Sequence, residues 1–311
     1  MKAFLLPSLI AASLTAVPAV SQETPRAWSL DTGGDLSAFL DCMEARQRTI
    51  VSAHRGGPTP GLPENSIEAM DALLHAAPAI MEIDVAQSSD GVLFLLHDDR
   101  LDRTTTGRGT AAQQQWADLA KLRLRDEAGW TTPYGIPTLA QALAWAKGRT
   151  VLQIDFKPSA SYDNTIAAIR DADMQHSVVL IAYSVASAVR LHRLAPDMTI
   201  SLSINRFDAL AEAIEAGIPS DRIVAFTGTR LPQPDLYAAL DESDVEVIFG
   251  TLGGAQSIDR QIGDLGIDER YADLGAAGVD IIATDRPREA AEALAEAGRL
   301  AGEGICGASR R

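Results

Sequence analysis

The sequence is poor in cysteine and in positive charge, and each shortage narrows what the protein can be. Only two of its 311 residues are cysteines, Cys42 and Cys306, and the absence of any Cys-x-x-Cys pair argues against a zinc ribbon. Lys and Arg number 27 against 42 Asp and Glu, which gives a net charge of −15. A surface this acidic repels nucleic acid at long range, so we expect no nucleic-acid partner. An anionic substrate needs a metal ion or a few well-placed Arg and Lys side chains to attract it.

Long apolar runs are also missing beyond the N-terminus. Residues 3–20 are mostly apolar, follow the basic start Met1-Lys2 and contain Pro7 and Pro18. Small residues at Ala19 and Ser21 resemble a cleavage site, so we interpret residues 1–21 as a secretory signal peptide. A membrane anchor needs roughly 20 unbroken apolar residues, and no later stretch reaches that length. We therefore expect a periplasmic or secreted protein without a stable membrane anchor.

The remaining chain shows no low-complexity tract, long linker or short repeat, so residues 22–311 are expected to form a single domain with a core of about residues 49–300. Short β-branched or apolar runs alternate with Ala/Leu-rich helical stretches. The predicted strands are residues 50–53, 81–85, 151–156, 178–182, 199–204, 223–226, 245–249 and 280–283. The predicted helices are residues 66–76, 138–146, 164–173, 185–194, 208–216, 235–240 and 269–277, with another after Pro287. This alternation predicts an α/β fold, a (β/α)8 TIM barrel with parallel strands.

One spacing is too long for a simple loop, between the second and third predicted strands. Residues 86–137 contain a predicted hairpin arm at 92–96, then a Thr/Gly-rich loop, then a predicted polar helix at 111–122. We interpret this segment as an insertion over the mouth of the barrel, where long structured loops commonly carry function.

Acidic residues mark the ends of two predicted strands. Glu82 and Asp84 are two residues apart in one strand, so both point to the same face. Asp155 lies in the next strand of the barrel, and all strand ends of a parallel barrel open on one face. Three carboxylates without cysteine favour a hard cation, Ca²⁺ or Mg²⁺. The alternative is an ion network in which Arg55 and Lys157 neutralise these acids.

Two histidines lie at strand ends beside charged residues and glycine. His54 precedes Arg55-Gly56, and His97 precedes Asp98-Asp99. Hydrolysis of a phosphodiester requires one proton to be taken and another to be given, and two imidazoles of near-neutral pKa suit both tasks. We interpret the other histidines, His75, His176 and His192, as structural.

An ordered set of motifs over about residues 49–300 resembles the glycerophosphodiester phosphodiesterase family. Its pieces are His54-Arg55-Gly56, Pro63-Glu64-Asn65-Ser66, Glu82-x-Asp84, His97-Asp98-x-x-Leu101-Asp102-Arg103, Ile136-Pro137-Thr138-Leu139, Asp155-Phe156-Lys157 and Thr284-Asp285-Arg286-Pro287. The sequence departs from the family pattern at Asp155, where Glu is usual. It departs again at Phe249-Gly250-Thr251, where a Trp-Thr-x-Asn segment is common.

The resemblance implies a TIM barrel that hydrolyses glycerophosphodiesters to sn-glycerol 3-phosphate and an alcohol, with a divalent metal. It implies His54 and His97 as general acid and base. The remaining implied site residues are the metal ligands Glu82, Asp84 and Asp155, the phosphate-contacting Arg55 and Lys157, and the supporting Glu64, Asn65 and Asp285.

Two other functions stay open at this stage. A phospholipase C- or D-like enzyme on intact lipid uses the same site but needs an apolar rim, whereas the insertion offers only Trp116 and Trp130 as obvious anchors. A periplasmic glycerophosphodiester-binding protein explains export and a pocket but not the paired histidines. The head group, the metal and the oligomeric state are left undetermined by the sequence.

The two cysteines form the last prediction. Cys42 lies in a helical-looking stretch before the first barrel strand, and Cys306 lies in a Gly-rich tail after the last helix. A closed barrel brings its first and last elements side by side, and export supplies an oxidising compartment, so we expect a Cys42–Cys306 disulfide. The alternative is two unpaired thiols.

Overall fold

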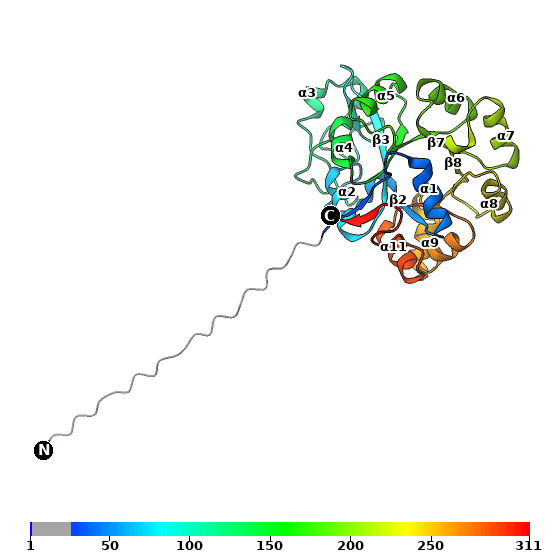
Figure 1. Cartoon of the computed structure of the whole chain (residues 1–311). Coiled ribbons are helices and arrows are strands. Elements are labelled where there is room, and N and C mark those ends of the chain that lie inside the picture. Colours follow the sequence, from blue (N-terminus) through cyan, green and yellow to red (C-terminus); the bar gives the residue numbers. More distant parts are fainter. Residues whose placement is uncertain (2–25) are drawn as a thin grey trace.

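The computed structural model describes residues 26–311 together with Met1, so the predicted signal peptide lies outside the described residues except for Met1. Eight parallel strands follow one another around a closed barrel, because the first strand pairs with both the second and the last. The strands are β2 (Ile50–Ala53), β3 (Ile80–Gln87), β5 (Leu152–Phe156), β6 (Val178–Ala182), β7 (Thr199–Ser203), β8 (Ile223–Phe226), β9 (Val247–Gly250) and β10 (Ile281–Thr284). The predicted TIM barrel is confirmed, with helices forming the outer ring (Figure 1).

Most helices of the ring begin at a side chain that can cap them. Ser66, Thr138, Ser161, Ser184 and Ser257 each accept a hydrogen bond from a backbone N–H of the first turn. The ring helices are α2 (Ile67–Ala76), α4 (Leu139–Ala146), α5 (Tyr162–Asp171), α6 (Val185–Leu194), α7 (Phe207–Glu215), α8 (Pro234–Asp241), α9 (Ile258–Leu265), α10 (Arg270–Ala276) and α11 (Pro287–Glu296). Of these, α9 was not predicted. No helix of the described chain is both long and apolar enough to cross a bilayer.

A further helix, α1 (Leu36–Ala45), closes the end of the barrel where the strands begin, and Figure 1 shows it over the centre of the ring. Its buried residues are spaced as one helical face, Leu36, Phe39, Leu40 and Met43. They pack against the layer of the barrel interior nearest the starts of the strands, which includes Ile50, Ile80, Val151, Val179, Val224 and Ile281. The opposite end of the barrel, where the strands end, stays open for a site among the described residues.

The N-terminal and C-terminal segments of the described chain are joined to each other beside α1. β1 (Trp28–Leu30) pairs antiparallel with β11 (Ala308–Arg310), and Figure 1 shows the red terminal strand next to the start of the described chain. Cys42 and Cys306, the predicted partners, form a disulfide with their Cα atoms 5.8 Å apart. The β1–β11 pairing and the disulfide therefore hold α1 in place from two sides.

The insertion between β3 and α4 differs from its prediction in one element. A hairpin arm, β4 (Leu93–Leu95), pairs antiparallel with the end of β3. The predicted helix at 111–122 is wrong: a short turn at Ala111–Gln113 is followed by the single-turn α3 (Trp116–Leu119). Gln114 and Gln115 are extended, because the backbone of Ser89 bonds to Gln114 and the carboxylate of Asp90 accepts the N–H of Trp116. These tertiary contacts override the local helical tendency.

Candidate active site

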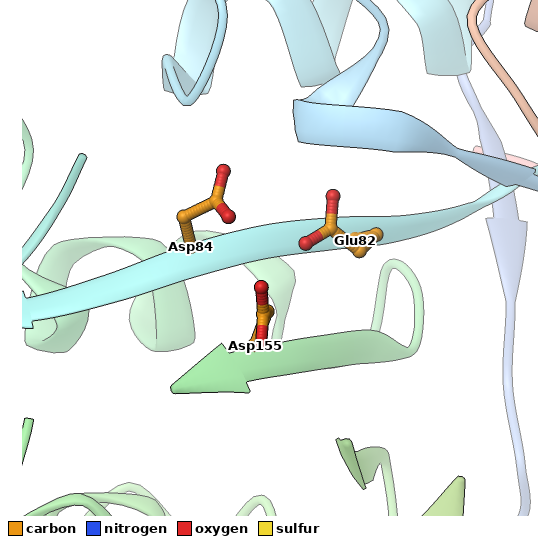
Figure 2. A group of neighbouring side chains, drawn as sticks. All are labelled: Glu82, Asp84 and Asp155. Carbon is orange, nitrogen blue, oxygen red and sulfur yellow. The ribbon is translucent and has the colours of Figure 1, made fainter. Parts of the chain in front are cut away.

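Three carboxylates meet inside the open end of the barrel. Glu82 and Asp84 project from β3, and Asp155 projects from β5 directly opposite Asp84 in the strand register (Figure 2). One oxygen from each lies within 4.8 Å of the others. Their exposed fractions are 9%, 1% and 7%, so the cluster is buried. The alternation of side chains along a strand brings Glu82 and Asp84 to the same face, as the spacing predicted.

These carboxylates have few positive partners. The Lys157 ammonium lies 2.6 Å from Asp84 and 2.7 Å from Asp155. The amide of Asn65 donates to Asp84 at 2.7 Å, and the backbone N–H of Arg55 donates to Glu82 at 2.7 Å. Asp155 Oδ1 is buried without any hydrogen-bond partner among the described residues. An orphaned carboxylate oxygen inside such a cluster indicates a place for a cation.

The electrostatics agree with that interpretation. Burial and the neighbouring charge of Asp84 raise the pKa of Glu82 to about 8, although His54 and the backbone N–H of Arg55 oppose the rise. The ionised form of Glu82 is therefore disfavoured until a further positive charge lies nearby. An all-oxygen donor set suits a hard divalent cation, so Glu82, Asp84 and Asp155 fit a metal ion.

His54 is presented by a tight turn directly after β2. Arg55, Gly56 and Gly57 all have left-handed backbone, with φ of 51°, 77° and 70°. A Cβ on Gly57 would lie 3.0 Å from Leu73 and 3.1 Å from Pro287, so glycine is required there for both conformation and space. This turn reverses the chain and leaves the imidazole at the mouth of the barrel.

His54 is held by Asp285 from the end of β10. Its Nδ1 lies 2.6 Å from Asp285 Oδ1. Burial alone would lower the pKa of His54, but the hydrogen bond to Asp285 and the charge of Glu82 raise it above the ordinary value.

Behind Asp285 lies a residue that the sequence did not single out. Asp259, only 2% exposed, accepts the backbone N–H of Asp285 at 2.6 Å. It also accepts the hydroxyls of Tyr271 at 2.6 Å and Thr284 at 2.8 Å. Asp259 is thus a positioning residue that fixes the backbone carrying the partner of His54. Its position in the unpredicted α9 explains why it was missed.

His97, which lies on the insertion side, is held by a carboxylate in the same way as His54. Its Nδ1 lies 2.7 Å from Asp98 Oδ1, and Arg103 donates to both oxygens of Asp98 at 2.7 and 2.8 Å. Arg103 also donates to both oxygens of Glu64 at 2.8 Å, and Arg55 donates to the same carboxylate at 3.1 and 3.2 Å. The hydrogen bonds from Arg103 hold the pKa of Asp98 well below its usual range. Asp98 and Arg103 lay within a motif, but the sequence assigned them no role.

A cavity of about 210 Å³, here called the barrel cavity, joins these groups. Six of the predicted site residues line it: His54, Glu82, Asp84, His97, Asp155 and Lys157. Arg55, Glu64 and Asp285 line a neighbouring cavity, and Asn65 is buried behind Asp84. The far wall is largely apolar, formed by side chains such as Phe226, Ile248 and Leu252. With a cation held by the three carboxylates, the polar wall would suit a small anionic group, and the apolar wall would suit its carbon atoms.

The chain resembles known proteins over most of its length. A model of the glycerophosphoryl diester phosphodiesterase family matches residues 54–216. A glycerophosphodiester phosphodiesterase of Bacillus subtilis (strain 168) is 25% identical over 223 residues, which are 65% of this chain and 73% of that protein.

Solved structures extend the likeness to the whole barrel. A glycerophosphoryl diester phosphodiesterase from Parabacteroides distasonis is 30% identical, with a TM-score of 0.82, and the match covers 92% of this chain and all of that one. A phosphodiesterase from Oleispira antarctica, solved in complex with the product sn-glycerol-3-phosphate, shares the fold, with a TM-score of 0.63 at 20% identity. That match covers 80% of this chain and 97% of the other.

Proposed function

Because the chain belongs to the glycerophosphoryl diester phosphodiesterase family and is a phosphoric diester hydrolase, we propose that it hydrolyses glycerophosphodiesters to sn-glycerol 3-phosphate and an alcohol by acid–base catalysis at His54 and His97. The observation that carries this proposal is the matched pair of imidazoles at the barrel cavity, each with Nδ1 bound to a carboxylate. The product in the Oleispira antarctica structure supports the choice of product.

The carboxylate partners determine what each ring can do. Asp285 and Asp98 occupy Nδ1, and Nε2 of both rings has no hydrogen-bond partner in the described chain. A neutral ring can then take a proton from the attacking oxygen at Nε2, and a protonated ring can give one to the leaving alcohol oxygen. The attacking oxygen forms a bond to phosphorus as the bond from phosphorus to the alcohol oxygen breaks, so one proton is removed and one is supplied. The ring that took the proton then returns it through solvent to the ring that gave one, which restores the starting state.

We propose that Glu82, Asp84 and Asp155 bind the divalent cation, Ca²⁺ or Mg²⁺. When bound, such an ion offsets the negative charge that develops on the phosphoryl oxygens. The proposed phosphate contacts are Lys157, which lies beside Asp84 and Asp155, and Arg55, at the turn after β2. Positive groups fixed in advance around the reacting phosphate stabilise its transition state, because they need no reorganisation.

We also propose that the protein is exported to the periplasm or secreted. The support is the apolar N-terminal segment and the Cys42–Cys306 disulfide, since disulfides persist in oxidising compartments. N-terminal sequencing of the protein recovered outside the cytoplasm tests this: a start at Gln22 agrees with the proposal, and an intact Met1 contradicts it.

The decisive assay measures sn-glycerol 3-phosphate released from glycerophosphocholine, with and without a chelator. We expect release that stops on chelation and returns with Ca²⁺ or Mg²⁺. Absence of release from every glycerophosphodiester, by a correctly folded and metal-supplied protein, would overturn the proposal. Cleavage of intact phospholipid in vesicles, without cleavage of the water-soluble diesters, would instead favour a phospholipase.

A further inference from the structure

A second cavity, here called the side cavity, opens next to the barrel cavity and has a volume of about 660 Å³. It lies between His54 and Arg55 of the barrel, Arg103, and the loop of residues 125–129 in the insertion. His54 lines both cavities. A phosphodiester bound at His54 can therefore place one substituent in each cavity. The barrel cavity is the smaller of the two, and the side cavity has room for a substituent that varies in size.

The charged groups that the barrel and Arg103 contribute to the side cavity largely neutralise one another. Arg55 and Arg103 share the carboxylate of Glu64, at 3.1 and 2.8 Å. Arg103 additionally pairs with Asp98, at 2.7 Å. Asp285 is bound to His54, and its second oxygen accepts the backbone N–H of Gly253 at 3.2 Å. These groups leave little unbalanced charge for a ligand.

The loop of residues 125–129 is fixed mainly through backbone groups. Asp126 accepts the backbone N–H groups of Gly61 at 3.0 Å and Trp130 at 2.8 Å. Arg125 donates to the carbonyl oxygens of Thr105 and Gly129, both at 2.9 Å. The loop is thus anchored at its start and at its turn.

Glu127 differs from these neighbours. It lines the side cavity from the tip of the anchored loop, and its carboxylate makes no hydrogen bond or ion pair in the described part of the chain. Glu127 is exposed at the loop tip, and partial burial of its carboxylate, together with the charges of Asp285 and Glu64, raises the pKa of Glu127, while the charges of Arg55 and Arg103 only partly oppose this. The surroundings of this carboxylate therefore favour the arrival of a positive charge.

We propose that the side cavity binds the alcohol part of the substrate and that Glu127 makes the enzyme prefer alcohols with a cationic ammonium group over neutral alcohols. The proposal rests on the proposed function, because it assigns a substrate class to the same site. A substrate of this class is zwitterionic: its phosphate lies at His54 and Lys157, and its ammonium lies near Glu127. Glu127 acts on binding and takes no part in the proton transfers.

The test compares two substrates that differ in the charge of the alcohol, glycerophosphocholine and glycerophosphoglycerol. We expect Glu127→Gln to lower the ratio of kcat/KM for the choline substrate over the glycerol substrate about two- to fivefold, the range for a solvent-exposed ion pair. Most of the change should appear in KM for the choline substrate. Glu127→Lys should lower the ratio further, and added salt should reduce the preference of the native enzyme. Glu292→Gln, on an exposed carboxylate of α11 outside both cavities, is the matched control and should leave the ratio unchanged.

The outcomes separate this inference from the function on which it rests. A native enzyme that hydrolyses neither substrate contradicts the proposed function itself. A native enzyme that hydrolyses both leaves that function standing, and an unchanged ratio in both Glu127 variants then overturns the role of Glu127. An equal loss on both substrates in Glu127→Gln also overturns it, because it indicates a structural role. Since a ratio within one preparation does not depend on the folded fraction, partial misfolding cannot imitate the expected result.

Discussion

A buried glutamate far from the active site should make the stability of the fold fall with rising pH. Glu246 immediately precedes β9 at the plugged end of the barrel and is 7% exposed. Burial raises the pKa of Glu246 to about 8, and the charges of Asp280, Asp41 and Glu44 add to this, while its own backbone N–H opposes it. Asp280 precedes β10, and the other two acids lie on α1. The helix α1 is thus packed over the carboxyl group of Glu246, which is protonated in the folded protein at neutral pH.

The sign and the size of the effect follow from proton linkage. The pKa is about 8 in the folded protein and 4.5 ordinarily, so the folded state binds the proton more tightly. The contribution to stability is complete below about pH 4.5 and is lost as the pH rises through about 8. The loss is ~1.4 kcal/mol per pH unit, which over this window amounts to about 3–5 kcal/mol. Burial and neighbouring acids also raise the pKa of Asp280 to about 6, which acts in the same direction at lower pH.

Glu246→Gln tests this because glutamine has the shape of the protonated acid and cannot ionise. We expect the variant to match the native protein near about pH 5 and to exceed its unfolding free energy by about 3–5 kcal/mol near about pH 8.5. Urea unfolding at both pH values, followed by circular dichroism with the disulfide intact, gives these free energies. The control is Glu292→Gln, which should behave as the native protein at both pH values. A native stability that does not fall between the two pH values, or a variant whose advantage is equal at both, would refute the reasoning.

Three further predictions concern the site and the disulfide. His54→Ala and His97→Ala should each lower turnover of glycerophosphocholine at least ~10²-fold with an unchanged circular dichroism spectrum, and near-native turnover in either would contradict the acid–base assignment. Asp155→Glu, which restores the residue usual in the family, should keep activity but change the relative activation by Ca²⁺ and Mg²⁺; loss of metal binding by calorimetry would contradict this. Replacing Cys42 and Cys306 by Ser should lower the unfolding free energy by up to about 5 kcal/mol, because the bridge closes a loop spanning 264 positions. Two free thiols in the non-reduced native protein, measured by mass spectrometry, would rule the bridge out.

The sequence predicted what depends on local spacing and strand order. Alternation along β3 places Glu82 and Asp84 together, and the parallel order of the strands brings Asp155 beside them. The turn after β2 needs its glycines for conformation and space, so the motif containing His54 marks its place without any structure.

The sequence did not predict what depends on contacts between distant segments. Asp259 reaches Asp285 only because α9 packs beside β10. The helix itself could have been predicted, because Ser257 and Gly266 are residue types that usually cap a helix. The helix expected at 111–122 is shortened by contacts with Ser89 and Asp90, about 25 residues earlier in the chain. The pairing of β1 with β11 joins two three-residue strands about 280 positions apart, too short to carry a periodic pattern.

The β1–β11 pairing and the Cys42–Cys306 disulfide also determine how the protein would respond to a pulling force. Trp28 is paired with Arg310, so tension applied outward from both ends peels the β1–β11 ladder one pair at a time. Separation of the two segments stops at the disulfide between Cys42 and Cys306, where a covalent bond carries the tension. At ~3.4 Å per residue, the segments 28–42 and 306–310 can release only about 6 nm of chain. The eight barrel strands lie inside the bridged loop and carry none of the tension, so a stretched molecule keeps its active site until the disulfide is reduced.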